Sequence, residues 1–333
     1  MDVSVICPVF DTPAGVLAAA VQSVLSQAGP HEIELILVND CSTDPATIAA
    51  LRDAAEGDSR VRVFNQERNA GPAEARSVGV AHARHDWVSF IDSDDLWPEG
   101  KLDQGATVLE EWPDSCWIGG SFSTLLPDGT LRPSVWLTAN CPPAAPGRTA
   151  QRLQTPASTR ALVGGWHPLG TSLFRRHLIA AAGGFNPRLT YGEDWLLSLR
   201  ISLLTPMDYI EDSTYVLRRQ GASLMRSPRR LSAEAMQGVL AARRDPALRF
   251  ASRQLRWLVY GSYKEVAMNN ALNGSRLRGL RFALLALLVD PREIGELFMF
   301  LRLLRKAGPA VASGFQRYST SEQLNFSDIK RLE

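Results

Sequence analysis

The sequence predicts an α/β fold: a mostly parallel β-sheet with helices on both faces. Over about the first 95 residues, four short apolar runs alternate with three segments whose apolar residues recur at helical spacing. Such alternation is typical of parallel sheets, in which each crossover helix packs back onto the sheet. The predicted strands are residues 3–9, 34–38, 61–64 and 87–91, and the predicted helices are residues 13–27, residues 44–55 and a segment opening at Gly71.

The first predicted helix has a start signal as well as a periodic interior. Its apolar residues lie at helical spacing: Leu17, Ala20, Val21, Val24 and Leu25. We expect Thr12 to be the N-cap, because its hydroxyl can accept a hydrogen bond from a free amide of the first turn. Pro13 would then occupy the first helical position, where its missing N–H costs nothing.

Changes in composition divide the rest of the chain. Residues 113–160 are rich in Pro, Gly, Ser and Thr, which predicts short strands and a mobile loop. Beyond Pro228 the pattern is helical, and the last residues are polar and small, which favours partial disorder. We therefore expect an α/β domain over residues 1–225, a basic helical region over residues 226–308 and a partly disordered tail over residues 309–333.

The net charge of +1 over 333 residues conceals a strong asymmetry. Residues 218–333 carry 21 Lys and Arg against 9 Asp and Glu, a net charge of +12. The residues before them carry 15 basic and 26 acidic side chains, a net charge of −11. The basic part therefore suits phosphate groups or an anionic membrane surface.

The cysteines and the apolar runs indicate the cell compartment. None of the four cysteines shows a CxxC spacing, which argues against a zinc site or a disulfide framework and fits a reducing cytosol. Asp2 stands where a signal peptide would be basic. The longest uninterrupted apolar run, residues 282–289, is shorter than the roughly 18 residues that span a bilayer. We expect a cytoplasmic chain with no membrane-spanning helix.

Carboxylates follow three of the predicted strands. Asp11 follows the first strand, Asp40 the second, and the cluster Asp92, Asp94 and Asp95 the fourth. In open parallel sheets, ligands bind at the carboxyl ends of the strands. Three carboxylates within four residues repel one another unless a cation lies among them, and hard divalent cations prefer oxygen ligands. The alternative is a solvated acidic turn that caps a helix.

Three strings place these carboxylates in one continuous pattern: VSVICPVFDTP, ELILVNDCSTD and NAGPAEARSVGVAHARHDWVSFIDSDDLW. The pattern resembles the nucleotide-sugar-binding half of the inverting family 2 glycosyltransferases, which have the GT-A, Rossmann-like fold. A later string, GGFNPRLTYGEDWLLSLR, resembles the acceptor-side segment of that family. The resemblance implies a nucleotide-sugar half over residues 1–98 and an acceptor half over residues 99–225, with the C-terminal helices as an appendix.

On the nucleotide side, the resemblance implies roles for three residues. Asp40 matches the carboxylate that hydrogen-bonds the base, usually uracil; an Asx turn or a helix cap is its alternative role. Asp11 matches a position near the ribose and base, with helix capping as an equal alternative. Arg76 matches a basic residue beside the nucleotide, although Ser77 replaces the usual Asn, and a surface salt bridge is its alternative.

The acidic cluster matches the metal-binding DxD motif of the family. Asp94 is then the direct ligand of Mn²⁺ or Mg²⁺, and Asp92 lies nearer the ribose or supports the metal. Asp95 would contact the hydroxyl groups of the donor sugar. In the family the metal bridges the two phosphates and neutralises the charge that develops on the leaving diphosphate.

On the acceptor side, Glu193 and Asp194 match a second acidic pair of the family. Asp194 matches the general base, and Glu193 stands beside it on the acceptor side; the alternative is an acidic first turn that complements a helix dipole. Trp166 either stacks on a sugar or packs in the core. Gln220 stands where the family has a His that reaches the metal or diphosphate, so either Arg219 and Ser223 hold the diphosphate or the ligand comes from elsewhere. The QxxRW motif of processive synthases is missing, which predicts a non-processive enzyme.

The basic helical region has two interpretations. Between residues 276 and 306, arginines surround a leucine-rich pattern. The helices either lie on an anionic membrane surface, near a lipid-linked acceptor, or pack against the catalytic domain or a second subunit as a homodimer contact. Nucleic-acid binding is not expected, because the basic residues alternate with leucine and do not form a patch with stacking aromatic rings.

These observations predict a metal-dependent inverting glycosyltransferase. It would move a sugar from a nucleoside-diphosphate sugar, with UDP as the favoured nucleotide, to a saccharide or a lipid-linked acceptor. The enzyme alternative is a nucleotidyltransferase, but residues 9–15 lack the basic, glycine-rich loop expected of one. The non-enzyme alternative is a silent scaffold that binds a sugar or nucleotide without turnover.

Overall fold

A computed structural model describes residues 1–134, 150–154, 157–164, 167–189, 191–219, 238–251 and 276–289, together with the single residues Leu255, Tyr263 and Ala267. The chain divides into two compact units. The first comprises Met1–Ser223 and Asp245–Ala251, and the second Leu224–Arg244 and Ser252–Glu333. The first unit includes Asp245–Ala251, which fall in the predicted basic helical region, and the domain boundaries expected at residues 225 and 308 stay predictions.

The first part of this domain confirms the predicted alternation of strands and helices. Strands β1 and β2 are buried along almost their whole length, which explains why their sequences are almost continuously apolar. The elements are β1 (Val3–Val9), α1 (Ala14–Leu25), β2 (Ile33–Asn39), α2 (Pro45–Gly57), β3 (Val61–Asn65), α3 (Pro72–His82) and β4 (Trp87–Phe90).

The remaining elements include strands that the sequence predicted only in general terms. They are α4 (Lys101–Glu111), β5 (Trp117–Leu125), β6 (Leu131–Pro133), β7 (Ala150–Leu153), α5 (Ala157–Gly164), a 3₁₀ turn (Leu169–Thr171), β8 (Leu173–Arg175), α6 (Arg176–Ala181), α7 (Glu193–Ile201), β9 (Met207–Arg218), a second 3₁₀ segment (Pro246–Ala251) and α10 (Arg276–Val289). Residues 135–149, within the stretch 113–160 for which short strands and a mobile loop were predicted, and the tail over residues 309–333 lie outside the described residues.

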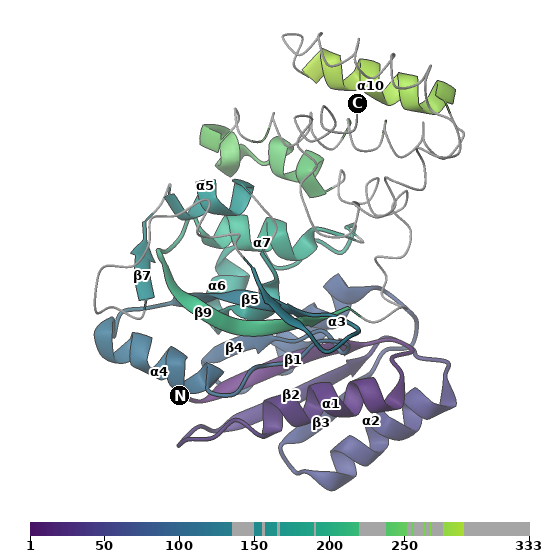
Figure 1. Cartoon of the computed structure of the whole chain (residues 1–333), viewed down its shortest axis with the longest axis vertical. Coiled ribbons are helices and arrows are strands. Elements are labelled where there is room, and N and C mark those ends of the chain that lie inside the picture. Colours follow the sequence, from purple (N-terminus) through teal and green to yellow (C-terminus); the bar gives the residue numbers. More distant parts are fainter. Residues whose placement is uncertain are drawn as a thin grey trace. The chain divides into compact units, whose positions relative to one another are not determined.

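All nine described strands belong to one sheet, in the order β3-β2-β1-β4-β8-β5-β9-β7, with β6 paired to β5. The strands from β3 to β4 are parallel, whereas β8 runs antiparallel to both of its neighbours. Helices α1 and α2 share one face and α3 covers the other (Figure 1), as right-handed crossovers require when the chain reverses direction along the sheet after β3. The carboxyl ends of β1, β2 and β4 therefore meet at one edge.

The start of α1 differs from the prediction. The helix begins at Ala14, its N-cap is Pro13, and no side chain caps it. The prediction that Thr12 is the cap is wrong, because Thr12 is buried and its hydroxyl lies 2.6 Å from the hydroxyl of Ser93 in the acidic cluster. The Thr12 hydroxyl is therefore used in a tertiary contact with Ser93 and not in capping α1, as the local sequence pattern had predicted.

A close helix–sheet contact fixes the position of α3. Gly79 lies against β1, where an added Cβ atom would come within 2.3 Å of Cγ2 of Ile6. Since Arg76 lies one turn earlier on the same helix, this contact also sets the depth at which the Arg76 side chain enters the domain.

Helix α10 is the longest described part of the second unit. Its small residues Ala283 and Ala286 are buried, whereas Leu284 and Leu288 are exposed. No helix among the described residues is long and apolar enough to cross a bilayer. The other helices predicted for residues 226–308 fall largely outside the described ranges.

Candidate active site

The acidic cluster forms a tight loop at the carboxyl end of β4. Ile91 extends the strand by donating its amide to the carbonyl of Ile6 at 3.0 Å. The amide of Asp95 then donates to the carbonyl of Asp92, also at 3.0 Å, which turns the chain. The hydroxyl of Ser93 contacts that of Thr12, which ties the middle of the loop to the segment before α1.

Strand β9 closes on this loop through Tyr215 and Arg218. The buried phenol of Tyr215 donates to Asp95 at 2.9 Å and accepts the amide of Asp92 at 3.1 Å. The amide of Arg218 donates to the second carboxylate oxygen of Asp95 at 2.8 Å. Asp95 is only 5% exposed, and both its oxygens are used within the protein. Burial, followed by repulsion from Asp92 and Asp94, raises its pKa well above the ordinary value.

Asp92 and Asp94 are the accessible carboxylates of the cluster. The side chain of Asp92 is 47% exposed, and Asp94 is half-buried. Burial, followed by repulsion from Asp92, raises the pKa of Asp94 to about 6. The Arg218 guanidinium binds the main-chain oxygen of Asp94 at 2.6 Å and so supports the backbone rather than the carboxylate. A cation held by these two carboxylates would relieve their repulsion.

Asp40 and Asp11 lie where the sequence placed them, and both accept backbone amides. Asp40 accepts the amides of Ala70 and Gly71, each at 2.8 Å, at the start of α3. Asp11, which has a positive φ of 45°, accepts the amides of Thr43 and Asp44 at the start of α2. These hydrogen bonds from the backbone amides of Asp44 and Thr43 lower the pKa of Asp11. Each carboxylate therefore organises the start of a helix that follows a neighbouring strand.

Arg76 joins the two halves of the site. Its Nη2 donates to Asp92 at 2.7 Å, and its Nη1 donates to Glu193 on α7, 117 residues further along the chain. The arginine is 6% exposed and Glu193 is 5% exposed. Burial alone would lower the pKa of Arg76, but its acidic neighbours Asp92 and Glu193 outweigh that effect and raise it. The surface salt bridge that the sequence left open is in fact a buried one.

Asp194 occupies the first turn of α7, directly after Glu193. One of its oxygens accepts the amide of Trp195 at 2.7 Å, and the residue is half-buried. Burial, followed by repulsion from Glu193, raises the pKa of Asp194 to about 7. A carboxylate in this condition is a far better proton acceptor near neutral pH than an ordinary aspartate.

Two further side chains beside the site were not predicted. Lys101 is 1% exposed, donates to the carbonyl of Gly170, and lies over the rings of Trp97 at 4.2 Å and Tyr215 at 5.8 Å. Burial lowers its pKa well below the ordinary value. Phe10, at the carboxyl end of β1, is instead 48% exposed. An aromatic residue directly before Asp11 was the signal that could have identified it.

The remaining predicted residues are only partly described. The amide of Arg219 donates to the carbonyl of Leu125 at 2.9 Å, which places Arg219 at the end of β9. Trp166 and Ser223 lie outside the described residues.

Residues 4–158 match the family described as Glycosyl transferase family 2. Residues 4–158, somewhat under half of the chain, therefore carry the sequence pattern of this family. Two curated relatives illustrate the range of similarity. TuaG of Bacillus subtilis, a glycosyltransferase named for teichuronic acid biosynthesis, is 37% identical over 128 residues, covering 38% of this chain and 49% of TuaG. Glycosyltransferase GlyG of Streptococcus pneumoniae is 26% identical over 230 residues, covering 68% of this chain and 73% of GlyG. The chain spans less than half the length of the first curated relatives that it matches.

The structure of the chain resembles that of Staphylococcus aureus TarS residues 1–349, crystallised in complex with UDP-GlcNAc. The TM-score is 0.62 at 19% sequence identity, and the match covers 98% of this chain and 94% of that one. This likeness confirms the GT-A architecture that the sequence predicted.

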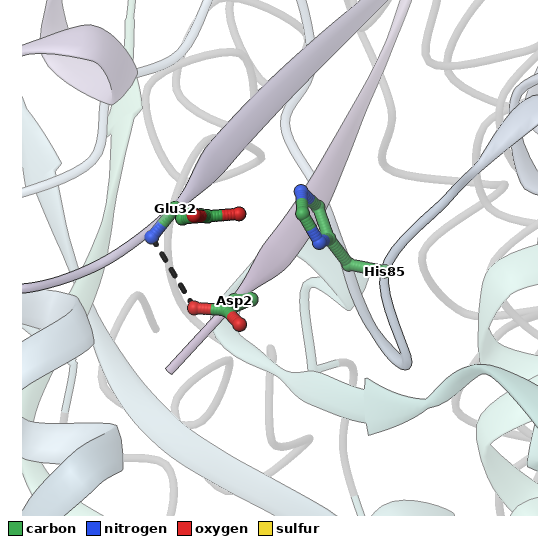
Figure 2. Close-up of side chains that lie close together, drawn as sticks. All are labelled: Asp2, Glu32 and His85. Atoms are coloured by element: carbon green, nitrogen blue, oxygen red, sulfur yellow. Dashed lines mark hydrogen bonds between the residues drawn. The ribbon is translucent and has the colours of Figure 1, made fainter.

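A second group of possible metal ligands lies at the opposite end of the parallel strands. Figure 2 shows Asp2, Glu32 and His85, which directly or closely precede β1, β2 and β4, and whose ligand atoms lie within 4.8 Å of one another. Asp2 and Glu32 are exposed. The amide of Glu32 donates to Asp2 at 3.4 Å. This group is therefore separate from the carboxyl-end loop that carries Asp92 and Asp94.

Proposed function

We propose that the chain is a metal-dependent, inverting, non-processive glycosyltransferase that uses a nucleoside-diphosphate sugar. One observation carries the proposal: the carboxylates at the end of β4 and those at the start of α7 are joined through Arg76. The first set suits a metal and a diphosphate, and the second set contains a base. The chemistry of glycosyl transfer needs these two functions next to each other.

The donor would bind at the carboxyl ends of β1, β2 and β4. Phe10 offers an exposed ring on which a base can stack, and Asp40 and Asp11 bring polar groups to the same edge. UDP is the favoured nucleotide, and the complex of TarS with UDP-GlcNAc supports this assignment by analogy of fold. Arg219, at the end of β9, is the candidate for the diphosphate, together with Ser223.

Asp94 and Asp92 fit a hard divalent cation, either Mn²⁺ or Mg²⁺. Both are accessible carboxylates, and burial, followed by repulsion from Asp92, raises the pKa of Asp94. When bound, such a cation would supply Lewis-acid stabilisation of the leaving diphosphate. Asp95 is a weaker candidate for the donor sugar than the sequence suggested, because it is buried and bonded to Tyr215 and Arg218. Its proposed role is to hold the loop in shape.

Asp194 would act as the general base. An acceptor hydroxyl transfers its proton to the Asp194 carboxylate while its oxygen forms a bond to the anomeric carbon. The bond between that carbon and the diphosphate oxygen breaks at the same time, and the nucleoside diphosphate leaves with the bonding electrons. A single displacement of this kind inverts the configuration at the anomeric carbon.

The acceptor is proposed to be a saccharide or a lipid-linked hydroxyl, with Trp166 as a candidate for stacking on it. The arginine-rich C-terminal region would contact an anionic membrane or a second copy of the chain. A cytoplasmic location, at or near the inner face of the membrane, remains a prediction.

The test is a panel of nucleotide sugars incubated with Mn²⁺, with and without candidate acceptors, and scored for nucleoside diphosphate release. We expect one donor to give acceptor-dependent release that EDTA abolishes and Mn²⁺ restores. Pyrophosphate release from a nucleoside triphosphate and a sugar phosphate would instead show a nucleotidyltransferase. Donor binding without turnover under every condition would show a silent scaffold, and failure of every donor to bind would overturn the proposal.

A further inference from the structure

The Arg76 side chain is committed to protein carboxylates. It leaves α3, is buried, and directs its two terminal nitrogens to Asp92 and to Glu193. Its Nε is also buried and has no partner among the described residues. Arginine forms two directed bonds from one planar group, which suits it to fixing two carboxylates relative to each other. A group engaged in this way is poorly placed to read a nucleotide, the role that the sequence suggested.

The bridge spans the parts of the site that must act together. Asp92 belongs to the loop proposed to bind the metal, and Glu193 directly precedes Asp194, the proposed base. Removing the arginine would leave two carboxylates, one of them buried, without their shared cation. Their repulsion would be relieved by movement of α7 away from β4, which would carry Asp194 with it.

We propose that Arg76 and Glu193 are positioning residues that hold the base-bearing end of α7 in register with the metal-binding loop. The proposal rests on the function proposed above. It makes the Arg76 guanidinium the link between the metal-binding loop and the start of α7, so that Arg76 affects the transfer step more than nucleotide binding.

The charges around Asp194 supply a readout that a purely structural residue would not change. Three charged groups act on it: Glu193 raises the Asp194 pKa, Arg76 lowers it, and Asp92 raises it. Replacing Arg76 with the uncharged Gln should therefore raise the pKa of Asp194. The acid limb of the pH profile of kcat, that is, the range over which kcat falls on acidification, should then move to higher pH. Replacing Glu193 with Gln should move that limb to lower pH. Shifts of the acid limb in opposite directions are expected only if the charges of Arg76 and Glu193 both act on Asp194, one lowering its pKa and the other raising it.

The experiment measures kcat, donor KM, UDP affinity and the acid limb for wild type, Arg76→Gln, Glu193→Gln and the double variant. We expect each single variant to lower kcat by about 10–100-fold, as a base displaced by about an ångström would. The UDP affinity should change by less than about threefold. The fold-loss of kcat in the double variant should be smaller than the product of the fold-losses in the two single variants. Glu193→Gln keeps the shape of the side chain, which guards against misfolding.

Arg62→Gln is the matched control. Arg62 pairs with the buried carboxylate Glu34, as Arg76 pairs with Glu193, but on β3 and β2. The control should lose stability while the acid limb and the UDP affinity stay at their wild-type values.

Two outcomes would overturn the inference. Loss of UDP affinity in Arg76→Gln, with kcat and the acid limb unchanged, would show that Arg76 contacts the nucleotide. Shifts of the acid limb in the same direction in both variants would contradict the bridge. If the wild-type chain transfers no sugar from any donor, the proposed function itself fails, and the inference falls with it.

Discussion

The carboxylates of the site have different environments, and these decide what each can do. Asp95 is buried and accepts two hydrogen bonds, Asp94 is half-buried beside a like charge, and Asp194 is half-buried beside Glu193. The sequence predicted that these residues matter, because each follows a strand or opens a helix. It could not predict which of them are free, because their partners Tyr215, Arg218 and Arg76 are distant in sequence.

The raised pKa of Asp194 predicts how activity depends on pH. A base must be ionised, so kcat should fall about tenfold per pH unit below about 7, the pKa of Asp194, and level off above it. A pH profile of kcat at saturating donor and acceptor checks this. A profile that stays flat down to pH 5 would mean that another group, or a base with an ordinary pKa, takes the proton.

Tyr215 should stabilise the metal-binding loop through its hydroxyl. Tyr215→Phe removes the donor to Asp95 and the acceptor for the Asp92 amide, which should cost about 1–3 kcal/mol of unfolding free energy. Denaturant unfolding measures this cost. Ser115→Ala is the control, because the buried hydroxyl of Ser115 has no partner among the described residues and its loss should cost less. Equal costs in the two variants would contradict a special role for Tyr215.

At the scale of elements, the first four strands and three helices were predictable because local pattern and burial agree. The buried parallel strands read as apolar runs, and each crossover helix shows its own period. The short strand β8 and its antiparallel pairing were not predictable, because three residues carry no usable periodicity and the pairing depends on β4 and β5. Thr12 shows the same limit at a helix start, where a tertiary partner replaced the local one.

The contact between α3 and β1 gives a prediction for an element. Gly79→Ala would place a methyl group 2.3 Å from Cγ2 of Ile6, so α3 must shift and take Arg76 with it. We expect a loss of about 1–3 kcal/mol in stability from overpacking, together with reduced kcat. Gly15→Ala in α1 is the control, because nothing lies within 4 Å of the added Cβ and the helix should be unaffected or slightly stabilised. Equal unfolding midpoints for the two variants would contradict this packing.

At the scale of the whole molecule, the domain can be seen as two sets of carboxylates attached to one sheet. Strand β4 ends in the loop proposed for the metal, α7 begins with the proposed base, and β9 closes on the loop through Tyr215. The family resemblance in the sequence predicted both sets. The buried bridge between them became visible only in the structure, because it joins residues 117 positions apart.

The central claim is that Asp194 takes the acceptor proton at a site that binds a nucleotide sugar. The most direct test compares the wild type with Asp194→Asn, using the donor that the panel identifies. The variant should stay folded at pH 8, where a carboxylate with a raised pKa destabilises the native state and its removal does not. We expect it to bind the donor with wild-type affinity in titration calorimetry and to transfer sugar at least a hundredfold more slowly. Wild-type transfer by the variant would contradict the account.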